Sequence, residues 1–381
     1  MFITQLVLKN WRNFRSVDVA LRDRAFLVGP NACGKSNFLD VFRFLRDIAK
    51  RGGGFQSAVH DRGGVSKIRC LAARQEPDVE IEISLAETPD AEVVWKYAIG
   101  FHQQTSGKRL PLLRYEKIWQ RSKLIVDRPN EDDKKDLLRL TQTHLEQISA
   151  NESFRDVADF LDKVLYLHLV PQLLKNPDAF SGPGIPGDPF GKNFLERVAR
   201  APEKTRKSRL KKIETVLRKA APQLRQLCDV KDESGFPHLE AIYEHWRPKG
   251  AKQREDQFSD GTLRLIALFW SLLEGDSLLL LEEPELSLNA AIVRLLPAIF
   301  YRLQKKKNRQ IMLSTHSVDL LSDEGIEAEQ VLLLIPESEG TRIQVASERQ
   351  DVKGLLESGF TIAEAVMPIA KPNFQGMLFE I

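Results

Sequence analysis

The sequence predicts an α/β protein with a parallel sheet at its core, an antiparallel sheet near the N-terminus and an inserted helical subdomain. The first observation is a glycine-rich segment at 29–36, which stands between an apolar strand and an amphipathic helix. The second is the last third of the chain, where short apolar runs alternate with helical patterns. The third is the alternation of apolar and polar residues over 79–101, which is typical of a half-exposed antiparallel sheet.

The predicted elements follow this plan along the chain. Alternating or continuous apolar residues predict strands at 2–8, 17–21, 25–28, 79–85, 93–101, 278–281, 311–314 and 331–335. Apolar residues at helical spacing predict helices at about 35–48, 262–273, 289–304 and 361–366. Because strands and helices alternate after residue 262, we expect a parallel sheet with covering helices in that part of the chain.

Changes in composition divide the chain into three predicted parts. Residues 1–126 form an N-terminal lobe with the glycine-rich segment and the antiparallel sheet. An acidic, proline-containing start and periodic leucines predict a helical insertion over 127–220, interrupted by a Pro/Gly-rich loop at 176–191. Residues 221–381 form the C-terminal lobe, which contains the α/β alternation.

Composition limits the class of protein. The 381 residues are 42% hydrophobic and 29% charged, which is typical of a globular protein, and the net charge of +3 neither requires nor excludes a nucleic-acid partner. Cys33, Cys70 and Cys228 are far apart, which argues against a zinc site or a disulfide framework and fits a reducing compartment. The N-terminus has the pattern of a strand and the apolar runs are too short to span a bilayer, so we expect a cytoplasmic protein.

The glycine-rich segment carries the strongest chemical signal. It matches the phosphate-binding pattern G-x-x-x-x-G-K-[ST] in full and lies between a strand and a helix, as that pattern requires. Its glycines let backbone N–H groups point at phosphate oxygens, and the following helix adds its positive end. Lys35 can then reach the β- and γ-phosphates of ATP, and the Ser36 hydroxyl can ligate Mg²⁺. The predicted nucleotide-binding residues here are Gly29, Pro30, Asn31, Ala32, Cys33, Gly34, Lys35, Ser36 and Asn37.

A pair of acids follows the apolar strand at 278–281. Glu282 and Glu283 would stand at the edge of the sheet, where one carboxylate can hold Mg²⁺ and the next can orient or deprotonate the attacking water. Taken alone, such a pair is more often the charged start of a helix. Together with the phosphate loop, it predicts Glu282 as a metal-side acid and Glu283 as a general base.

Two further segments are candidates for the same site. Ser259 is a predicted helix N-cap, and Gly261 leaves backbone N–H groups of that turn accessible to an anion. A plain helix start is the alternative. His316 follows the strand at 311–314, and ligands of open α/β sheets bind at the C-terminal ends of strands. A structural or surface histidine is the alternative there.

These four segments, in this order, resemble the ATP-binding-cassette ATPases of the RecF, SMC and OLD group, and most closely the ATPases found in bacterial anti-phage defence operons. The resemblance covers roughly 1–50 and 235–350. It implies that two nucleotides lie between two protomers, with each ATP contacting the phosphate loop and acids of one chain and the signature turn of the other.

The resemblance also implies a role for each candidate residue. It gives Lys35, Glu283 and His316 as catalytic, Ser36 and Glu282 as metal ligands, and Ser259 and Gly261 as the signature that contacts the γ-phosphate in trans. Arg12 is implied to lie near the nucleotide, with a solvated arginine at a strand edge as an equal alternative. Glu282 stands where Asp is usual, Asn289 stands where relatives carry Asp or His, and Gln75 is a weak candidate for the glutamine loop.

Three functions remain open on these residues. The leading one is an ATP-hydrolysing dimeric switch, the ATPase component of a bacterial defence or DNA-maintenance system that acts with a separate effector such as a nuclease. The alternatives are the ATP-binding subunit of a transporter and a nucleotide-binding scaffold with negligible hydrolysis. Basic residues at 203–219 and 305–309 make DNA a further candidate partner, although a charged helix is more often a solvated face.

Overall fold

The computed structural model describes residues 1–73, 77–105, 107–177, 187–244 and 250–370. Contacts group the chain into two units, one made of Met1–Val164 with Arg309–Ile381 and the other of Leu165–Asn308. The division predicted from composition, after residues 126 and 220, stays a prediction. Within the described ranges, no helix combines the length and the apolar composition needed to cross a membrane.

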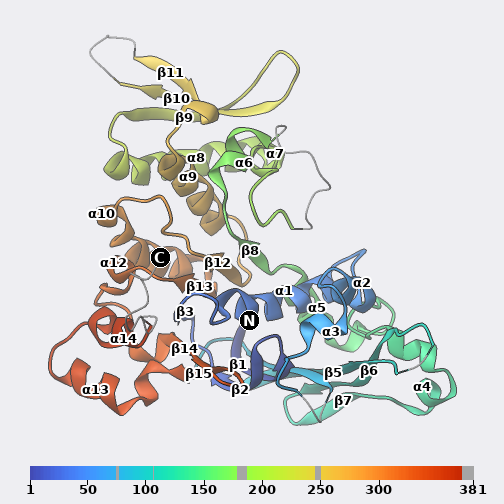
Figure 1. The fold of residues 1–381 in the computed structure, drawn as a ribbon. Coiled ribbons are helices and arrows are strands. Elements are labelled where there is room, and N and C mark those ends of the chain that lie inside the picture. The colour runs from blue at the N-terminus through green and yellow to red at the C-terminus, as the bar shows by residue number, and fades with distance from the viewer. Residues whose placement is uncertain (74–76, 106, 178–186, 245–249, 371–381) are drawn as a thin grey trace, which may run out of the picture. The chain divides into compact units, whose positions relative to one another are not determined.

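The first unit contains a six-stranded antiparallel sheet (Figure 1). Its strands follow the order β2 (Phe14–Ala20), β1 (Phe2–Trp11), β4 (Val79–Ala86), β5 (Val93–Gln103), β6 (Pro111–Gln120) and β7 (Lys123–Arg128). The register places Leu6 opposite Val19 in β2 and Ile83 in β4, and all three side chains are buried on one face. The strands predicted at 2–8, 79–85 and 93–101 are confirmed.

The strand that leads into the glycine-rich segment lies in a parallel arrangement of the same unit. β3 (Arg24–Val28) pairs in parallel with both β13 (Ile311–Thr315) and β14 (Val331–Glu337). β15 (Gly340–Val345) adds an antiparallel strand beside β14. All five residues of β3 are buried, as expected for a central strand that is covered on both faces.

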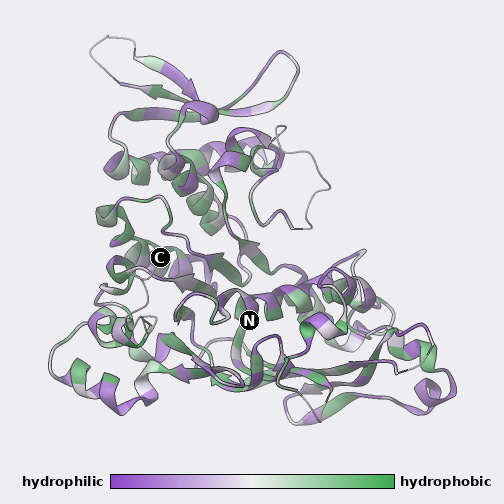
Figure 2. Cartoon of the chain, in the orientation of Figure 1, coloured by the Kyte–Doolittle hydropathy of each residue, from purple (hydrophilic) through white to green (hydrophobic). Residues whose placement is uncertain are grey.

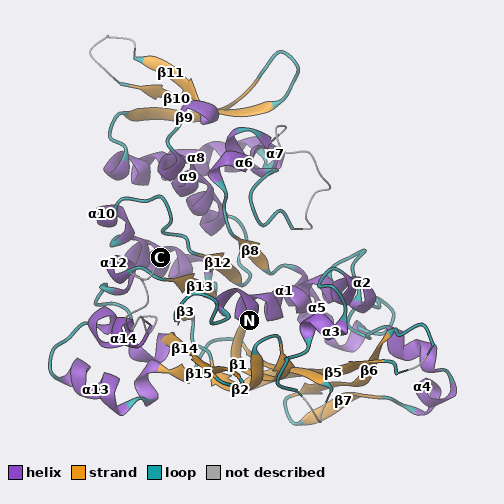
Figure 3. Cartoon of the chain, in the orientation of Figure 1, coloured by secondary structure: helices purple, strands orange, loops and turns teal. Residues whose placement is uncertain are grey.

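The first unit also contains helices. They are α1 (Lys35–Ala49), α2 (Phe55–His60), α3 (Val65–Ile68), α4 (Glu131–Lys135), α5 (Arg155–Asp162), α12 (Val318–Leu321), α13 (Gln350–Glu357) and α14 (Ile362–Ala370), with short 3₁₀ turns at Leu137–Thr141, Glu152–Phe154, Ala328–Gln330 and Ala346–Glu348. In Figure 3, α1, α2 and α5 lie on one face of the antiparallel sheet. The Phe44 ring of α1 lies 5.2 Å from Trp11 and 5.5 Å from Phe101, centroid to centroid, which anchors α1 to β1 and β5.

The second unit combines a pair of parallel strands and a three-stranded antiparallel sheet with helices. β8 (Leu165–Leu167) pairs in parallel with β12 (Leu279–Glu282), and β9 (Leu224–Lys231), β10 (Pro237–Tyr243) and β11 (Ala251–Arg254) form an antiparallel sheet with β10 in the middle. The helices are α6 (Pro171–Lys175), α7 (Phe194–Arg200), α8 (Glu203–Ala220), α9 (Asp260–Leu273), α10 (Ala290–Val293) and α11 (Leu296–Lys307), with a 3₁₀ turn at Glu255–Gln257. Most of α9 is apolar, whereas α8 is largely hydrophilic (Figure 2).

Besides the short strand β8, which was not predicted, the second unit differs from the sequence prediction in two places. The single helix expected at 289–304 is two helices, α10 and α11. Pro297 lies in the first turn of α11 and lacks the N–H that a continuous helix would need there. The sheet of β9, β10 and β11 was not predicted, because charged residues interrupt the apolar alternation in its strands.

Candidate nucleotide-binding site

The glycine-rich segment forms a tight turn between β3 and α1. Gly34 is the N-cap residue of α1, and its φ of 101° lies in the left-handed region that favours glycine. A Cβ at Gly34 would lie 2.2 Å from Nδ2 of Asn13. A Cβ at Gly29 would lie 2.5 Å from the Leu334 carbonyl oxygen. Both glycines are therefore required by the close approach of their neighbours.

Lys35, the first residue of α1, turns its amine back onto the loop. Its Nζ donates to the carbonyl oxygens of Gly29 and Pro30, at 3.0 Å each. The same amine lies 4.0 Å from Cys33 Sγ. Burial raises the pKa of the Cys33 thiol more than Lys35 lowers it, so Cys33 is a packed, protonated thiol rather than a reactive one. The lysine thus holds the loop in shape and places a cation at its centre.

Asn13, in the turn between β1 and β2, braces the loop from outside. Its Nδ2 donates to the Cys33 carbonyl oxygen and to Thr341 Oγ1, at 2.7 Å each. Its Oδ1 accepts from Nδ2 of Asn37 at 2.8 Å, and its backbone oxygen accepts from the Thr341 N–H at 2.7 Å. Asn13 therefore joins the loop, the first turn of α1 and β15. Sequence reasoning missed it, because its only signal was its place next to Arg12.

Arg12, which the resemblance places near the nucleotide, binds an acid on α1. Its Nη2 donates to Oδ2 of Asp40 at 3.0 Å, and Nη2 of Arg62 donates to the other carboxylate oxygen at 2.8 Å. Burial raises the pKa of Asp40, but the nearby cations, Arg62 foremost, outweigh it and leave that pKa below its ordinary value. The charged Asp40 therefore orients Arg12 along α1.

A cavity of about 650 Å³ opens beside the phosphate loop. Its lining includes Arg12, Asn13 and Asn37, and it also receives the basic side chains of Lys67 and Arg69. Small-molecule sites typically have volumes of about 300–1,000 Å³. The first unit thus offers a ligand-sized space with positive charge directly next to the loop.

The paired acids lie at the end of β12, in the second unit. The hydroxyl of Tyr166, on the neighbouring strand β8, donates to Oε2 of Glu282, and His168 Nδ1 lies 3.9 Å from the same oxygen. Glu283 follows with a φ of 44°, a left-handed conformation that is uncommon for a residue with a side chain. Such strained backbone concentrates at functional sites. Tyr166 positions the Glu282 carboxylate. Tyr166 itself lies on β8, a strand of three residues that was too short to be predicted.

The predicted signature turn opens α9 in the same unit. Ser259 is the N-cap residue, and its Oγ accepts a backbone N–H of the first turn at 3.2 Å, which confirms the predicted helix start. Asp260 accepts from Lys175 Nζ at 2.5 Å. A Cβ at Gly261 would lie 2.7 Å from the Ser287 carbonyl oxygen. The turn therefore packs closely against the segment that follows the acids.

His316 directly follows β13, in the first unit. β13 runs parallel to β3 with Thr315 opposite Val28, so Gly29 and His316 leave the sheet at the same edge. Ligands of open α/β sheets bind at this edge, where the C-terminal ends of the strands meet. The topology therefore brings the histidine to the edge at which the phosphate loop begins.

The predicted site residues are thus divided between the units. The first unit holds Arg12, the loop from Gly29 to Asn37, and His316, whereas the second holds Ser259, Gly261, Glu282 and Glu283. Asn289 is the N-cap residue of α10, with its side chain accepting the Ala291 N–H at 2.9 Å. Gln75 lies outside the described residues.

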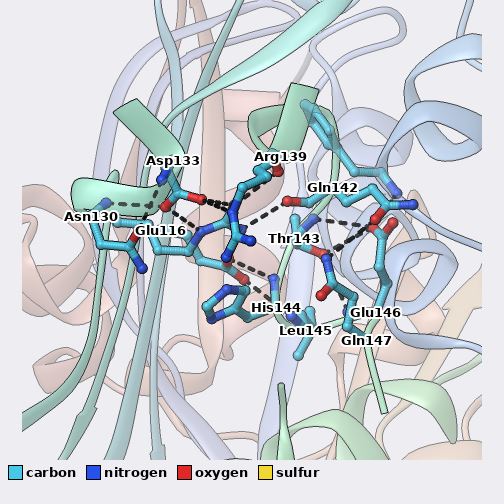
Figure 4. Close-up of polar contacts among 12 residues, drawn as sticks. Glu116, Asn130, Asp133, Arg139, Gln142, Thr143, His144, Leu145, Glu146 and Gln147 are labelled. Carbon is cyan, nitrogen blue, oxygen red and sulfur yellow. Dashed lines mark hydrogen bonds and ion pairs between the residues drawn. The ribbon is translucent and has the colours of Figure 1, made fainter. Parts of the chain in front are cut away.

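A buried polar cluster in the first unit involves none of these residues (Figure 4). Arg128 Nη1 lies 3.1 Å from Oε2 of Glu116, and Nη2 lies 2.9 Å from Oδ1 of Asp133. Burial raises the pKa of Glu116 more than the backbone N–H of His144 and Arg128 lower it. Burial, helped by Arg128, lowers the pKa of His144 to about 4. The cluster links residues 130–147 to the ends of β6 and β7 and therefore has a structural role.

Mg²⁺ is the metal that the phosphate-loop pattern implies. Among the residues that the structure describes, no group of three or more His, Cys, Asp or Glu side chains is placed to hold a metal ion. The predicted donors, the Ser36 hydroxyl and the Glu282 carboxylate, are hard oxygens. Mg²⁺ usually binds one or two such protein donors together with water and nucleotide phosphates. The donor chemistry therefore fits Mg²⁺ that binds together with a nucleotide.

The fold, together with the phosphate loop, is that of the ATP-binding-cassette ATPases. A crystal structure of an SMC head bound to the C-terminal winged-helix domain of ScpA is similar, with a TM-score of 0.53 and 14% identity over 90% of this chain and 98% of that one. The Pyrococcus furiosus SMC head with an extended coiled coil is similar with a TM-score of 0.51 and 13% identity. That match covers 94% of this chain and 100% of the other. The chain belongs to the AAA family described as "AAA domain, putative AbiEii toxin, Type IV TA system", whose model matches residues 24–323.

A curated relative matches a short stretch. Endonuclease GajA of Bacillus cereus (strain VD045) is 36% identical over 67 residues, which is 18% of this chain and 12% of that protein. The match therefore spans about an eighth of the relative's length. These comparisons confirm the predicted α/β ATPase fold and the resemblance to the RecF, SMC and OLD group.

Proposed function

We propose that this chain binds and hydrolyses MgATP and works as an ATP-driven dimeric switch. The observation that carries the proposal is the geometry of the phosphate loop. Gly34 is left-handed, Lys35 points its amine into the loop, and Ser36 stands in the first turn of α1. A loop of this form binds phosphates through backbone N–H groups and the positive end of the helix.

Each remaining candidate has a role in this proposal. Lys35 stabilises the β- and γ-phosphates, and Ser36 and Glu282 hold the Mg²⁺ that neutralises phosphate charge. Glu283 orients the attacking water and accepts its proton. Ser259 and Gly261 act on the nucleotide of a second protomer, with Arg12 and His316 near the nucleotide of their own.

We also propose a partner class for the switch. The family description names a toxin–antitoxin system, and the short match is to an endonuclease, which supports a bacterial defence or DNA-maintenance role with a separate nuclease or toxin as effector. Free Cys33, Cys70 and Cys228 suit a reducing cytoplasm. DNA stays a candidate ligand. Several charges of the basic helix α8 are already paired, among them Lys207 with Glu203.

ATP hydrolysis and molecular mass, measured together, test the proposal. Lys35→Ala should weaken MgATP binding at least about tenfold, because the loop loses its cation. Glu283→Gln should keep MgATP binding, lose about 10²-fold or more in hydrolysis and accumulate as an ATP-dependent dimer. Glu324→Gln, at an exposed position, is the matched control and should leave all three quantities unchanged.

The outcomes separate the competing functions. Hydrolysis by Glu283→Gln at the wild-type rate, without ATP-dependent association, would show that the general base and the dimer are wrongly assigned. Tight MgATP binding with no turnover in the wild type would favour the non-hydrolysing scaffold. Stimulation of wild-type hydrolysis by duplex DNA, lost as salt is raised, would identify DNA as a ligand.

A further inference from the structure

A groove of about 450 Å³ is lined by residues of four helices of the second unit, α8, α9, α10 and α11. Its floor is α9, through Leu265 and Phe269. One wall is the C-terminal part of α8, with Val216, and the other is formed by α10 and α11, with Ile292 and Ile299. A channel between helices with apolar walls has the shape that accepts a further helix.

The wall made by α10 and α11 presents an open apolar face. Leu295 is 46% exposed, and Ala291 and Ala298 are also exposed, at spacings of four and three residues. The opposite face of the same segment is buried through Leu296 and Phe300. A surface helix normally buries one apolar stripe and turns polar residues outward, so a second apolar stripe indicates a contact surface.

The rim of the groove is positively charged. Lys219 stands on the α8 wall and Arg302 on the α11 wall, and both are exposed. Helix α8 carries eight basic residues against two acidic ones, and α11 ends in Lys305, Lys306 and Lys307 without an acidic residue. Within the described ranges, neither Lys219 nor Arg302 has an acidic partner, whereas Arg218 is paired with Glu214. The rim therefore offers uncompensated positive charge to whatever lies in the groove.

We propose that this groove docks an amphipathic helix of a partner protein, with its apolar side against Leu295 and Phe269 and acidic residues facing Lys219 and Arg302. Charge complementarity selects the occupant. A second copy of the same face would bring like charges together, and a nucleic acid would leave the apolar floor and walls without matching contacts.

The groove is connected to the signature turn through the chain itself. Helix α9 begins after Ser259 and forms the floor about two turns later, and α10 begins after Asn289 and forms one wall. A helix bound in the groove would therefore rest on the two helices that Ser259 and Asn289 cap. The inference goes beyond the proposed function and does not depend on ATP hydrolysis, because docking uses none of the nucleotide-binding residues.

Fluorescence anisotropy with a designed probe tests the proposal on the full chain without ATP. The probe is a labelled helical peptide of about 18 residues, with leucines at helical spacing and flanking glutamates. Leu295→Asp should weaken its binding at least about tenfold, and Lys219→Glu with Arg302→Glu should weaken it severalfold. The charge-reversed double variant should in turn prefer a matched peptide with lysines in place of the glutamates.

Matched controls keep the result interpretable. Leu124, on β7 of the first unit, is 40% exposed, so Leu124→Asp adds the same charge at a comparable surface position outside the groove. It should bind the acidic peptide as the wild type does. Thermal unfolding of each variant, followed by circular dichroism, verifies that the helices remain folded.

Three outcomes would overturn the proposal. The first is no binding of the acidic peptide to the wild type. The second is equal binding by Leu295→Asp, or equal binding of a peptide whose leucines are replaced by serine. The third is competition by a labelled DNA duplex that displaces the peptide. If the charge reversal weakens binding of this duplex and Leu295→Asp does not, the face is a nucleic-acid surface. Wild-type hydrolysis measured alongside separates these failures from failure of the ATPase proposal.

Discussion

Replacing Asn13 by alanine tests whether the N-terminal hairpin holds the phosphate loop in place. The substitution removes two hydrogen bonds of 2.7 Å donated by Nδ2 and one of 2.8 Å accepted by Oδ1. A typical intramolecular hydrogen bond contributes about 1 kcal/mol net, which sets an upper value of ~3 kcal/mol. Because Asn13 is half-buried and water can replace part of these bonds, we expect the free energy of unfolding to fall by about 2 kcal/mol.

Affinity for MgATP is the more specific readout. Without the Asn13 donor to the Cys33 carbonyl oxygen, the nucleotide must order the loop when it binds. Each ~1.4 kcal/mol of binding free energy used for this ordering raises the Kd about tenfold. We expect Asn13→Ala to raise the Kd of a fluorescent ATP analogue by about three- to tenfold. Gln5→Ala breaks an exposed side-chain hydrogen bond from β1 to Asp18 of β2 and is the matched control.

A double-mutant cycle shows whether the effect passes through β15. Asn13→Ala and Thr341→Val remove the same hydrogen bond, so their coupling energy should be about 1 kcal/mol. Strict additivity of the two substitutions, together with an unchanged Kd for the ATP analogue, would refute the reasoning. A loss of stability no larger than that of Gln5→Ala would refute it as well.

Three further substitutions follow from the geometry. Gly34→Ala should abolish measurable ATP binding, in equilibrium titration, because the left-handed backbone costs about 1–2 kcal/mol and the new Cβ would collide with a neighbouring side chain. Arg128→Ala should lower the free energy of unfolding in urea by about 3–5 kcal/mol, because fully buried Glu116 loses its cation. The hydrogen bond that His238 donates to the Glu255 carboxylate raises the pKa of His238, so the stability from this pair is complete below about pH 6.5 and is lost as pH rises through the folded pKa; His238→Gln should remove the decline in Tm that follows as the pH is raised above about 6.5.

Each of these substitutions has a control in the same chain. Gly52 has a φ of 74°, and a Cβ at this position would have no neighbouring atom within 4 Å. Gly52→Ala therefore carries the backbone strain of Gly34→Ala without the collision and should bind ATP normally. Lys134→Ala breaks an exposed ion pair and should change the free energy of unfolding by less than about 1 kcal/mol. His60→Gln, at an exposed position, should leave the pH dependence of Tm intact.

The phosphate loop and its flanks could be predicted because their signals are local. The apolar run of β3, the left-handed Gly34 and the helical spacing of α1 each depend on a few neighbouring residues. The helix start at Ser259 was predictable for the same reason, since an N-cap serine and its hydrogen-bonded partner lie within one turn. Interactions within a few residues of the chain were sufficient to predict these features.

The features that could not be predicted depend on contacts between residues that are distant in the sequence. Asn13 binds Thr341, and Tyr166 binds Glu282, and no spacing rule connects either pair. The strands β9 to β11 are stabilised mainly by pairing with one another, so their mixed polarity concealed them. The break at Pro297 could have been predicted, because proline in the first turn is a start signal that the apolar period overrode.

The position of β3 in the sheet has a consequence for how the protein is made. Both strands that pair with it, β13 and β14, come roughly 280 residues or more after it, beyond the whole second unit. A ribosome adds about 5–20 residues per second, so the apolar strand next to the phosphate loop spends roughly 15–60 s without its neighbours. Nascent chains are therefore expected to need a holding chaperone during this interval. The nucleotide loop can reach its final geometry only after β13 and β14 have been synthesised.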